Sequence, residues 1–135
     1  TAIFDIFEFV FERKRMKKIA IVNQRYGLEV NGGSEYYTRL IAERLADKYE
    51  VEVLTSCAVD YMTWANFYEE GVEEINGVRI RRFKSERERE RKRFDGLTSR
   101  ILQKQMRTSQ LEKEWVEEQG PYCPPLIDYI VEHEC

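Results

Sequence analysis

The stretch KKIAIVNQRYGLEVNGGSEYYTRLIAERLADKYEVEVLTS, residues 17–56, decides the fold class. Its apolar run at residues 19–22 is short and mostly β-branched, as a buried parallel strand requires. From Ser34 to about Lys48, apolar residues recur at helical spacing, which predicts a helix of about four turns with Ser34 as its cap. Residues 49–56 predict a second strand. A strand, a helix and a strand in so short a stretch predict an α/β fold with a parallel sheet.

A β-hairpin is predicted further along the chain. The segment VEEINGVRIRRF, residues 72–83, contains the dipeptide Asn76-Gly77, which is typical of the tight turns that join two antiparallel strands. After this turn Val78, Ile80 and Arg82 alternate with Arg79, Arg81 and Phe83. This alternation indicates a strand in which one of the two sets of side chains faces the core.

The second half of the chain is predicted to be mainly helical. The charge run at residues 85–95 is typical of a solvated linker or a helix start. Apolar residues at helical spacing follow over residues 97–118, with a break near Thr108-Ser109, and Gly120-Pro121 ends this part. Pro124-Pro125 suits the first turn of a last helix.

Composition limits the class of protein. The chain has 135 residues, 42% of them hydrophobic, which suffices for one domain or part of one but not for two. Its formal net charge of −3 gives no general attraction to nucleic acid. Three widely spaced cysteines and a single histidine predict neither a disulfide framework nor a metal site, and they fit a reducing cytoplasm.

Both ends of the chain are unusual for a complete domain. Residues 1–15 place an apolar block ahead of positive charges, the reverse of a secretion signal. They are open to three interpretations: non-native sequence translated ahead of a start at Met16, an amphipathic helix on a membrane surface, or a helix packed on a partner. We favour the first. Residues 16–135 are then expected to be one partial domain, since the apolar pattern LIDYIVEHE runs to Cys135 without a helix cap.

The glycine loop, QRYGLEVNGG at residues 24–33, is the strongest candidate for a binding site. It leaves the carboxyl end of a predicted parallel strand and leads into the amino end of a helix, where free N–H groups and the helix dipole favour a phosphate or a sugar hydroxyl. The loop has no G-x-G-x-x-G fingerprint, and Gly33 stands where a Walker A loop needs lysine. Neither a typical dinucleotide site nor a P-loop is therefore predicted.

Residues 16–84 resemble the amino-terminal start of family 4 glycosyltransferases, which are retaining enzymes of the GT-B fold. The resemblance rests on several short segments together. These are the Gly32-Gly33-Ser34-Glu35 opening of the first helix, IAERL at residues 41–45, EVEVLT at residues 50–55, and INGVRIRRF at residues 75–83.

This resemblance implies transfer of a sugar from a nucleotide-activated donor, with retention, in a cleft between two Rossmann-like domains. The chain would supply an incomplete N-terminal domain, a Rossmann-like parallel sheet with a β-hairpin insertion. The amides of Gly32, Gly33 and Ser34 would then lie near the donor diphosphate or the acceptor. Glu35 would support the loop or reach the acceptor. By their position, Arg25 and Asn31 are further candidates to contact acceptor or phosphate.

The resemblance also implies what the chain lacks. The family's donor-binding glutamates lie in the second domain, so no catalytic residue is assigned and these residues are expected to be inactive alone. No metal and no cofactor besides the nucleotide-sugar co-substrate is expected. The expected partners are a glycan, lipid-linked or small-molecule acceptor and the missing C-terminal domain, without nucleic acid.

The expected location is the cytoplasm or the inner membrane face, and contact with a membrane surface stays open. Two other functions also stay open. One is a nucleotide- or phosphate-binding Rossmann-like module without catalysis. The other is a membrane-associated interaction protein that uses residues 3–18 and the arginine-rich run.

Overall fold

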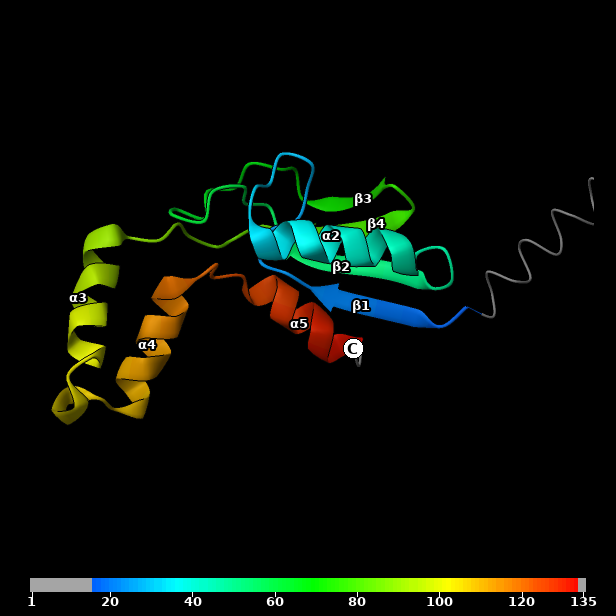
Figure 1. Ribbon diagram of the computed structural model, residues 1–135. Coiled ribbons are helices and arrows are strands. Elements are labelled where there is room, and N and C mark those ends of the chain that lie inside the picture. Colours follow the sequence, from blue (N-terminus) through cyan, green and yellow to red (C-terminus); the bar gives the residue numbers. More distant parts are fainter. Residues whose placement is uncertain (1–15, 134–135) are drawn as a thin grey trace, which may run out of the picture.

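Four strands form one mixed sheet in the order β1-β2-β4-β3 (Figure 1). The computed structural model describes residues 16–133. Strands β1 and β2 are parallel, β2 and β4 are parallel, and β3 is antiparallel to β4. The predicted α/β class is confirmed, while the predicted extension at residues 1–15 lies outside the described residues. In chain order the elements are β1 (Lys18–Val22), α2 (Gly33–Leu45), β2 (Glu50–Ser56), β3 (Gly71–Ile75), β4 (Val78–Phe83), α3 (Arg91–Ile101), the 3₁₀ helix η1 (Lys104–Met106), α4 (Ser109–Gln119) and α5 (Pro124–Glu132).

The first strand, helix and second strand form the predicted unit. In the parallel pair Ile19 lies opposite Val51, and Val22 lies opposite Leu54. The predicted cap is wrong, because α2 is capped by Gly32 without a side-chain hydrogen bond. Ser34 lies inside the first turn, where its hydroxyl donates to Glu35 Oε2 over 2.8 Å. The cap lies two residues before the predicted position, so Ser34 is a helical residue.

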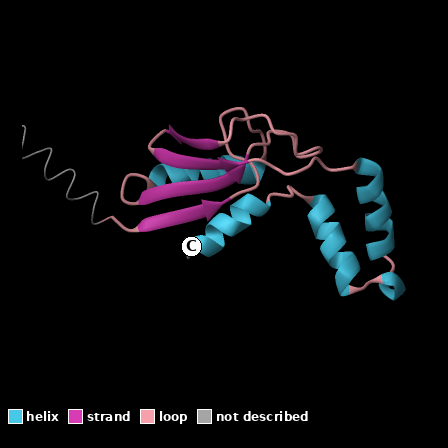
Figure 2. Cartoon of the chain, turned by 180° about the vertical axis from the view of Figure 1, so that it is seen from behind, coloured by secondary structure: helices cyan, strands magenta, loops and turns pink. Residues whose placement is uncertain are grey.

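The two faces of the sheet differ in their cover (Figure 2). On one face α2 packs over a buried apolar cluster made of Tyr26, Ala42, Val51, Val53, Val78 and Ile80. On the other face α5 contacts the sheet through Tyr129. Its ring lies 5.5 Å from the ring of Phe83, and the guanidinium of Arg81 lies 4.6 Å from its centre. The alternation of side chains along β2 and β4 therefore gives the sheet one apolar face and one partly charged face.

The predicted hairpin is formed by β3 and β4. Its turn places Asn76 at φ 51° and Gly77 at φ 80°, the left-handed values that a tight hairpin turn requires. Because β4 also pairs with β2 in parallel, it is the third parallel strand of the sheet. Arg82 is buried with Val78 and Ile80 on the face that α2 covers, as their alternation indicates.

Helices α3 and α4 form a helical hairpin, residues 91–119, which we call the arm. It extends away from the sheet (Figure 1). Its helices pack through Leu97 and Leu111, which are buried, and through Trp115, whose indole N–H donates to Thr98 Oγ1 over 3.0 Å. The predicted break is confirmed, since Thr108 caps α4 by accepting from the N–H of Leu111. Within residues 16–133, no helix is long and apolar enough to cross a bilayer.

Candidate functional site

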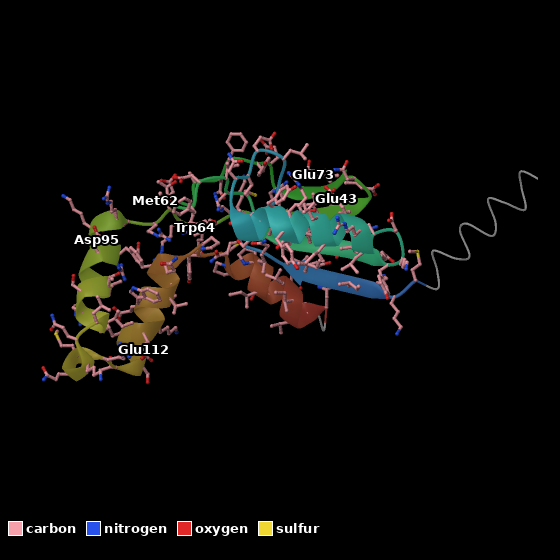
Figure 3. The ribbon with its side chains drawn as sticks, in the orientation of Figure 1. Glu43, Met62, Trp64, Glu73, Asp95 and Glu112 are labelled. Carbon is pink, nitrogen blue, oxygen red and sulfur yellow. The ribbon has the colours of Figure 1, made fainter. Side chains whose placement is uncertain are left out.

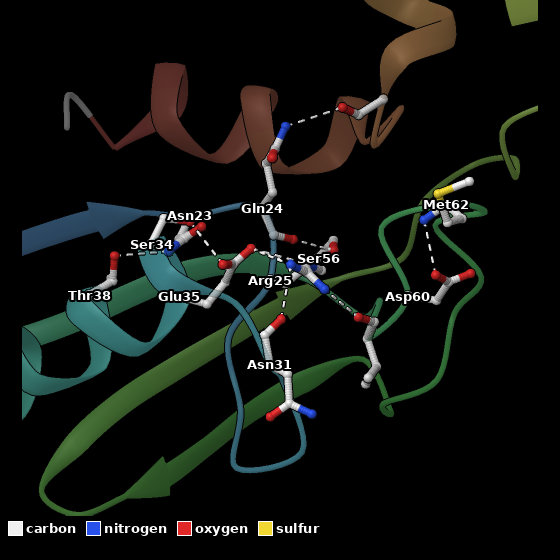
Figure 4. Close-up of polar contacts among 12 residues, drawn as sticks. Asn23, Gln24, Arg25, Asn31, Ser34, Glu35, Thr38, Ser56, Asp60 and Met62 are labelled. Carbon is white, nitrogen blue, oxygen red and sulfur yellow. Dashed lines mark hydrogen bonds and ion pairs between the residues drawn. The ribbon is translucent and has the colours of Figure 1, made fainter.

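The glycine loop lies at the carboxyl edge of the parallel strands, next to the ends of β1 and β2. Ser56 Oγ donates to the carbonyl of Gln24 over 2.6 Å, which ties the loop to the end of β2 (Figure 4). The side chain of Asn23 donates to Thr38 Oγ1 over 2.9 Å, which ties the end of β1 to α2. The start of the loop is therefore held by both elements that flank it.

A buried ion pair fixes the far end of the loop. Arg25 Nε and Nη2 donate to Glu35 Oε1 over 3.0 and 2.6 Å, and the two side chains are only 9% and 10% exposed. The same guanidinium donates to the carbonyls of Val59, over 2.8 Å, and Asn31, over 3.3 Å. The structure thus places Arg25 among acceptors of the protein itself, and Asn31 contributes its carbonyl to them. Both residues hold the loop in shape (Figure 4).

The carboxylate of Glu35 stays charged at the amino end of α2. Burial by itself raises the pKa of Glu35, but hydrogen bonds from Ser34, from its own backbone N–H and from Arg25, with the positive charge of Arg25, bring this pKa below its usual range. A negative charge is also favoured in the first turn of a helix. The pair formed by Arg25 and Glu35 is therefore charged but close to neutral in sum.

A second buried arginine, Arg82 on β4, holds the main chain of the glycine loop. Its Nη1 donates to the carbonyl of Tyr26 over 2.5 Å, and its Nε and Nη2 donate to Glu73 Oε1 over 3.0 and 2.8 Å. The ring of Tyr68 stacks on this guanidinium at 3.7 Å. Sequence reasoning did not assign Arg82 to the site, although its position on the same face of the strand as Val78 and Ile80 was a signal that it is buried.

Tyr68 covers the middle of the glycine loop. Its hydroxyl donates to the carboxylate of Glu29, and burial together with this carboxylate raises the pKa of Tyr68 to about 12. A Cβ on Gly27 would lie 2.7 Å from Cζ of the Tyr68 ring. Gly27 is therefore needed for the close approach of this ring.

The base of the arm also reaches the loop. The side chain of Gln24 donates to the carbonyl of Gly120 over 3.2 Å. Trp64, which Figure 3 labels, is buried and donates its indole N–H to the carbonyl of Gln119 over 2.7 Å. Arg89 donates to that same carbonyl. The loop is thus held between the sheet, α2 and the base of the arm.

Gly32 and Gly33 are exposed at the amino end of α2, as the binding hypothesis requires. The N–H groups of Gly33 and Ser34 belong to the first turn, where an α-helix offers them no acceptor. A Cβ on Gly33 would meet nothing within 4 Å, so open space lies beside it. These amides can donate to an anion or a hydroxyl that approaches from solvent.

Comparison with known proteins adds no functional information, because no family model, no curated protein and no solved structure matches this chain. Any function is therefore argued from the residues and their geometry.

Two grooves of the described region lie away from these glycines. One, of about 530 Å³, lies on the α5 face and is lined by residues such as Ala20, Glu52 and Tyr129. The other, of about 230 Å³, lies near Tyr49 and Gly77. Neither of these two grooves is lined by a residue of the glycine loop.

Outside the glycine loop, the described residues include acidic side chains, one histidine and two cysteines. Among residues 16–133, no group of three or more acidic, histidine or cysteine side chains is arranged to hold a metal ion. Cys57 and Cys123 are buried free thiols, and burial raises the pKa of each to about 11. Few thiolates therefore form at neutral pH, and neither cysteine is suited to act as a nucleophile.

Separate substitutions of Gly32 and Gly33 should show which of these two exposed glycines the shape of the loop requires. A Cβ on Gly32 would meet Glu35 Oε2 and would lie 3.1 Å from Arg25 Nη2, so Gly32→Ala displaces one partner of the buried ion pair. We expect a loss of about 1.5 kcal/mol in the free energy of unfolding. Gly33→Ala is the matched control and should change it by less than about 0.5 kcal/mol. Urea denaturation measures both, and equal losses would contradict the proposed role of Gly32.

Proposed function

We propose that this chain forms the first half of a two-domain glycosyltransferase and binds a nucleotide-activated sugar at its glycine loop. The observation that carries this proposal is the pair of open amides, at Gly33 and Ser34, at the positive end of α2 and at the carboxyl edge of a parallel sheet. A diphosphate or a sugar hydroxyl is the ligand chemistry that such amides accept.

The surrounding residues support binding rather than catalysis. The Arg25–Glu35 pair, the Arg82 contacts and the Ser56 hydrogen bond hold the loop before a ligand arrives, which reduces the entropy lost on binding. In this proposal Gly32, Gly33 and Ser34 contact the donor diphosphate or the acceptor, and Arg25, Asn31 and Glu35 position them. In the proposed Rossmann-like sheet β4 is the third parallel strand, and β3 is an antiparallel addition at the edge. Donor-binding carboxylates in a second domain complete the enzyme, so the 135 residues alone bind without transferring sugar.

A second candidate function is a nucleotide- or phosphate-binding module without catalysis. It is favoured by the contacts of Arg25, Ser56 and Arg82, which hold the loop in shape from within the same chain. Such a module needs no further domain in order to bind.

A titration followed by NMR tests the binding step. We expect the backbone amide resonances of Gly33 and Ser34 to shift on addition of UDP-glucose, GDP-mannose or inorganic pyrophosphate, with dissociation constants near the millimolar range. The amide of Gly77, at the opposite edge of the sheet, is the internal control. If all three compounds leave Gly33 and Ser34 unchanged, or shift Gly77 equally, the binding site is excluded.

Turnover distinguishes the two functions. Donor hydrolysis or sugar transfer by the longest polypeptide that the gene encodes would support the enzyme. Binding of the donor by that polypeptide without either reaction would exclude the enzyme and leave the binding module.

A further inference from the structure

The end of the arm that is farthest from the sheet presents apolar side chains to solvent. We call residues 100–107 the arm tip; they include the end of α3 and all of η1 (Figure 1). Leu102 is 73% exposed and Met106 is 44% exposed. Packing of the arm does not require either of them, because its helices are joined through Leu97, Leu111 and Trp115.

Charge is distributed unevenly along the arm. Residues 96–111 contain no aspartate or glutamate and carry Arg100, Lys104 and Arg107, although the whole chain has 25 acidic against 22 basic residues. The acidic residues that flank this stretch in sequence are Asp95 and Glu112, which Figure 3 labels. The arm tip is therefore locally cationic in a chain that is acidic overall.

The cations are close in sequence to the exposed apolar residues. Arg107 Nε and Nη2 donate to the carbonyl of Ile101 over 3.1 and 3.0 Å, which closes the turn after α3. The positive charge of Arg107 is thus held at the residue that precedes Leu102 in sequence. Arg100 is in the last turn of α3, and Lys104 begins η1. Exposed apolar side chains flanked by basic ones are typical of segments that bind at the surface of a bilayer.

We propose that the arm tip docks on an anionic lipid bilayer. Leu102 and Met106 enter the boundary between headgroups and acyl chains, while Arg100, Lys104 and Arg107 contact lipid phosphates. A bilayer accepts protruding apolar side chains without a matching pocket, and its negative surface attracts the cations. A nucleic acid would use the same cations, but it would leave Leu102 and Met106 in water.

Vesicle sedimentation tests this docking with the 135-residue chain. We expect the chain to sediment with vesicles of phosphatidylcholine and phosphatidylglycerol but not with pure phosphatidylcholine, and less at about 0.5 M than at about 0.1 M salt. Leu102→Asp combined with Met106→Asp should lower the partition coefficient at least about tenfold. Arg100→Gln combined with Lys104→Gln should lower it by about 25-fold, since each charge near the surface contributes about fivefold.

The matched control is Val131→Asp on α5, where the replaced side chain is 72% exposed and outside the arm. It should change the partition coefficient by less than about twofold. Circular dichroism should show unchanged folding in every variant, because the substituted side chains are exposed. Failure of the unmodified chain to sediment, equal binding to both kinds of vesicle, or an equal loss in Val131→Asp would each overturn the proposal. The proposal would also be overturned if the chain bound duplex DNA but no vesicles, and if the double variant with Leu102→Asp and Met106→Asp still bound the DNA.

Discussion

Replacement of Arg82 by methionine is expected to lower the free energy of unfolding by about 3 kcal/mol. The guanidinium is 2% exposed and donates to the carbonyl of Tyr26 and to Glu73. Methionine fills much of the same volume but leaves the Tyr26 carbonyl without its donor in a buried place. Glu73 is half exposed, so water can solvate its carboxylate after the change, which limits the loss.

The same substitution should loosen the glycine loop. Tyr68 loses the guanidinium on which it stacks, and Tyr26 loses its main-chain anchor. Relative to the unmodified chain, we therefore expect hydrogen exchange to speed up more at residues 26–30 than at β2. We also expect a fall of about 10 °C in Tm.

A control on the same strand separates burial from charge. Arg79 is half exposed and lies 3.7 Å from Glu50, so Arg79→Met removes an equal charge from the surface. It should change the free energy of unfolding by less than about 0.5 kcal/mol. Urea denaturation of both variants measures the difference, and a similar effect for both would show that the buried contacts of Arg82 contribute little.

The elements predicted from local patterns are present in the structure. The β-branched run at residues 19–22, the periodic helix and the second strand each depend on neighbours in sequence, which is why they could be predicted. The turn at Asn76-Gly77 was predictable for the same reason, because its dipeptide tolerates positive φ at both positions. The break predicted near Thr108-Ser109 is present, and in the structure Thr108 caps α4.

The contacts that shape the candidate site were not predictable in this way. Arg25 was expected near a ligand, yet its guanidinium binds Glu35 and the carbonyl of Val59, a residue 34 positions away. Arg82 reaches Tyr26 across 56 positions. Partners this distant in sequence are set by the tertiary fold, so no local pattern carries them. The cap predicted at Ser34 was wrong because the helix begins earlier, with Gly32 as its cap.

Substitution of Arg25 by glutamine is expected to have the other large effect, a loss of about 3 kcal/mol at neutral pH. It leaves the carboxylate of Glu35, 10% exposed, without its cation, and it removes the donors to Val59 and Asn31. Exposed Arg44 on α2 is the control, and Arg44→Gln should lose less than about 0.5 kcal/mol. Replacing both partners, as Arg25→Met with Glu35→Leu, should cost less than Arg25→Gln alone, because no buried charge remains unpaired.

The pH dependence of this loss gives the sharpest test of the ion pair. In the unmodified chain the pKa of Glu35 is below its usual range, so this carboxylate stabilises the folded state above the usual carboxyl pKa and ceases to do so as the pH falls through the lowered value. In Arg25→Gln burial is no longer offset by the cation, so the pKa of Glu35 should rise and protonation should relieve the unpaired charge. The difference between the two proteins should therefore shrink from about 3 kcal/mol at pH 7 to about 1 kcal/mol near pH 4. Urea denaturation across this range measures it, and a difference that stays constant would show that Glu35 is not the group that Arg25 keeps charged.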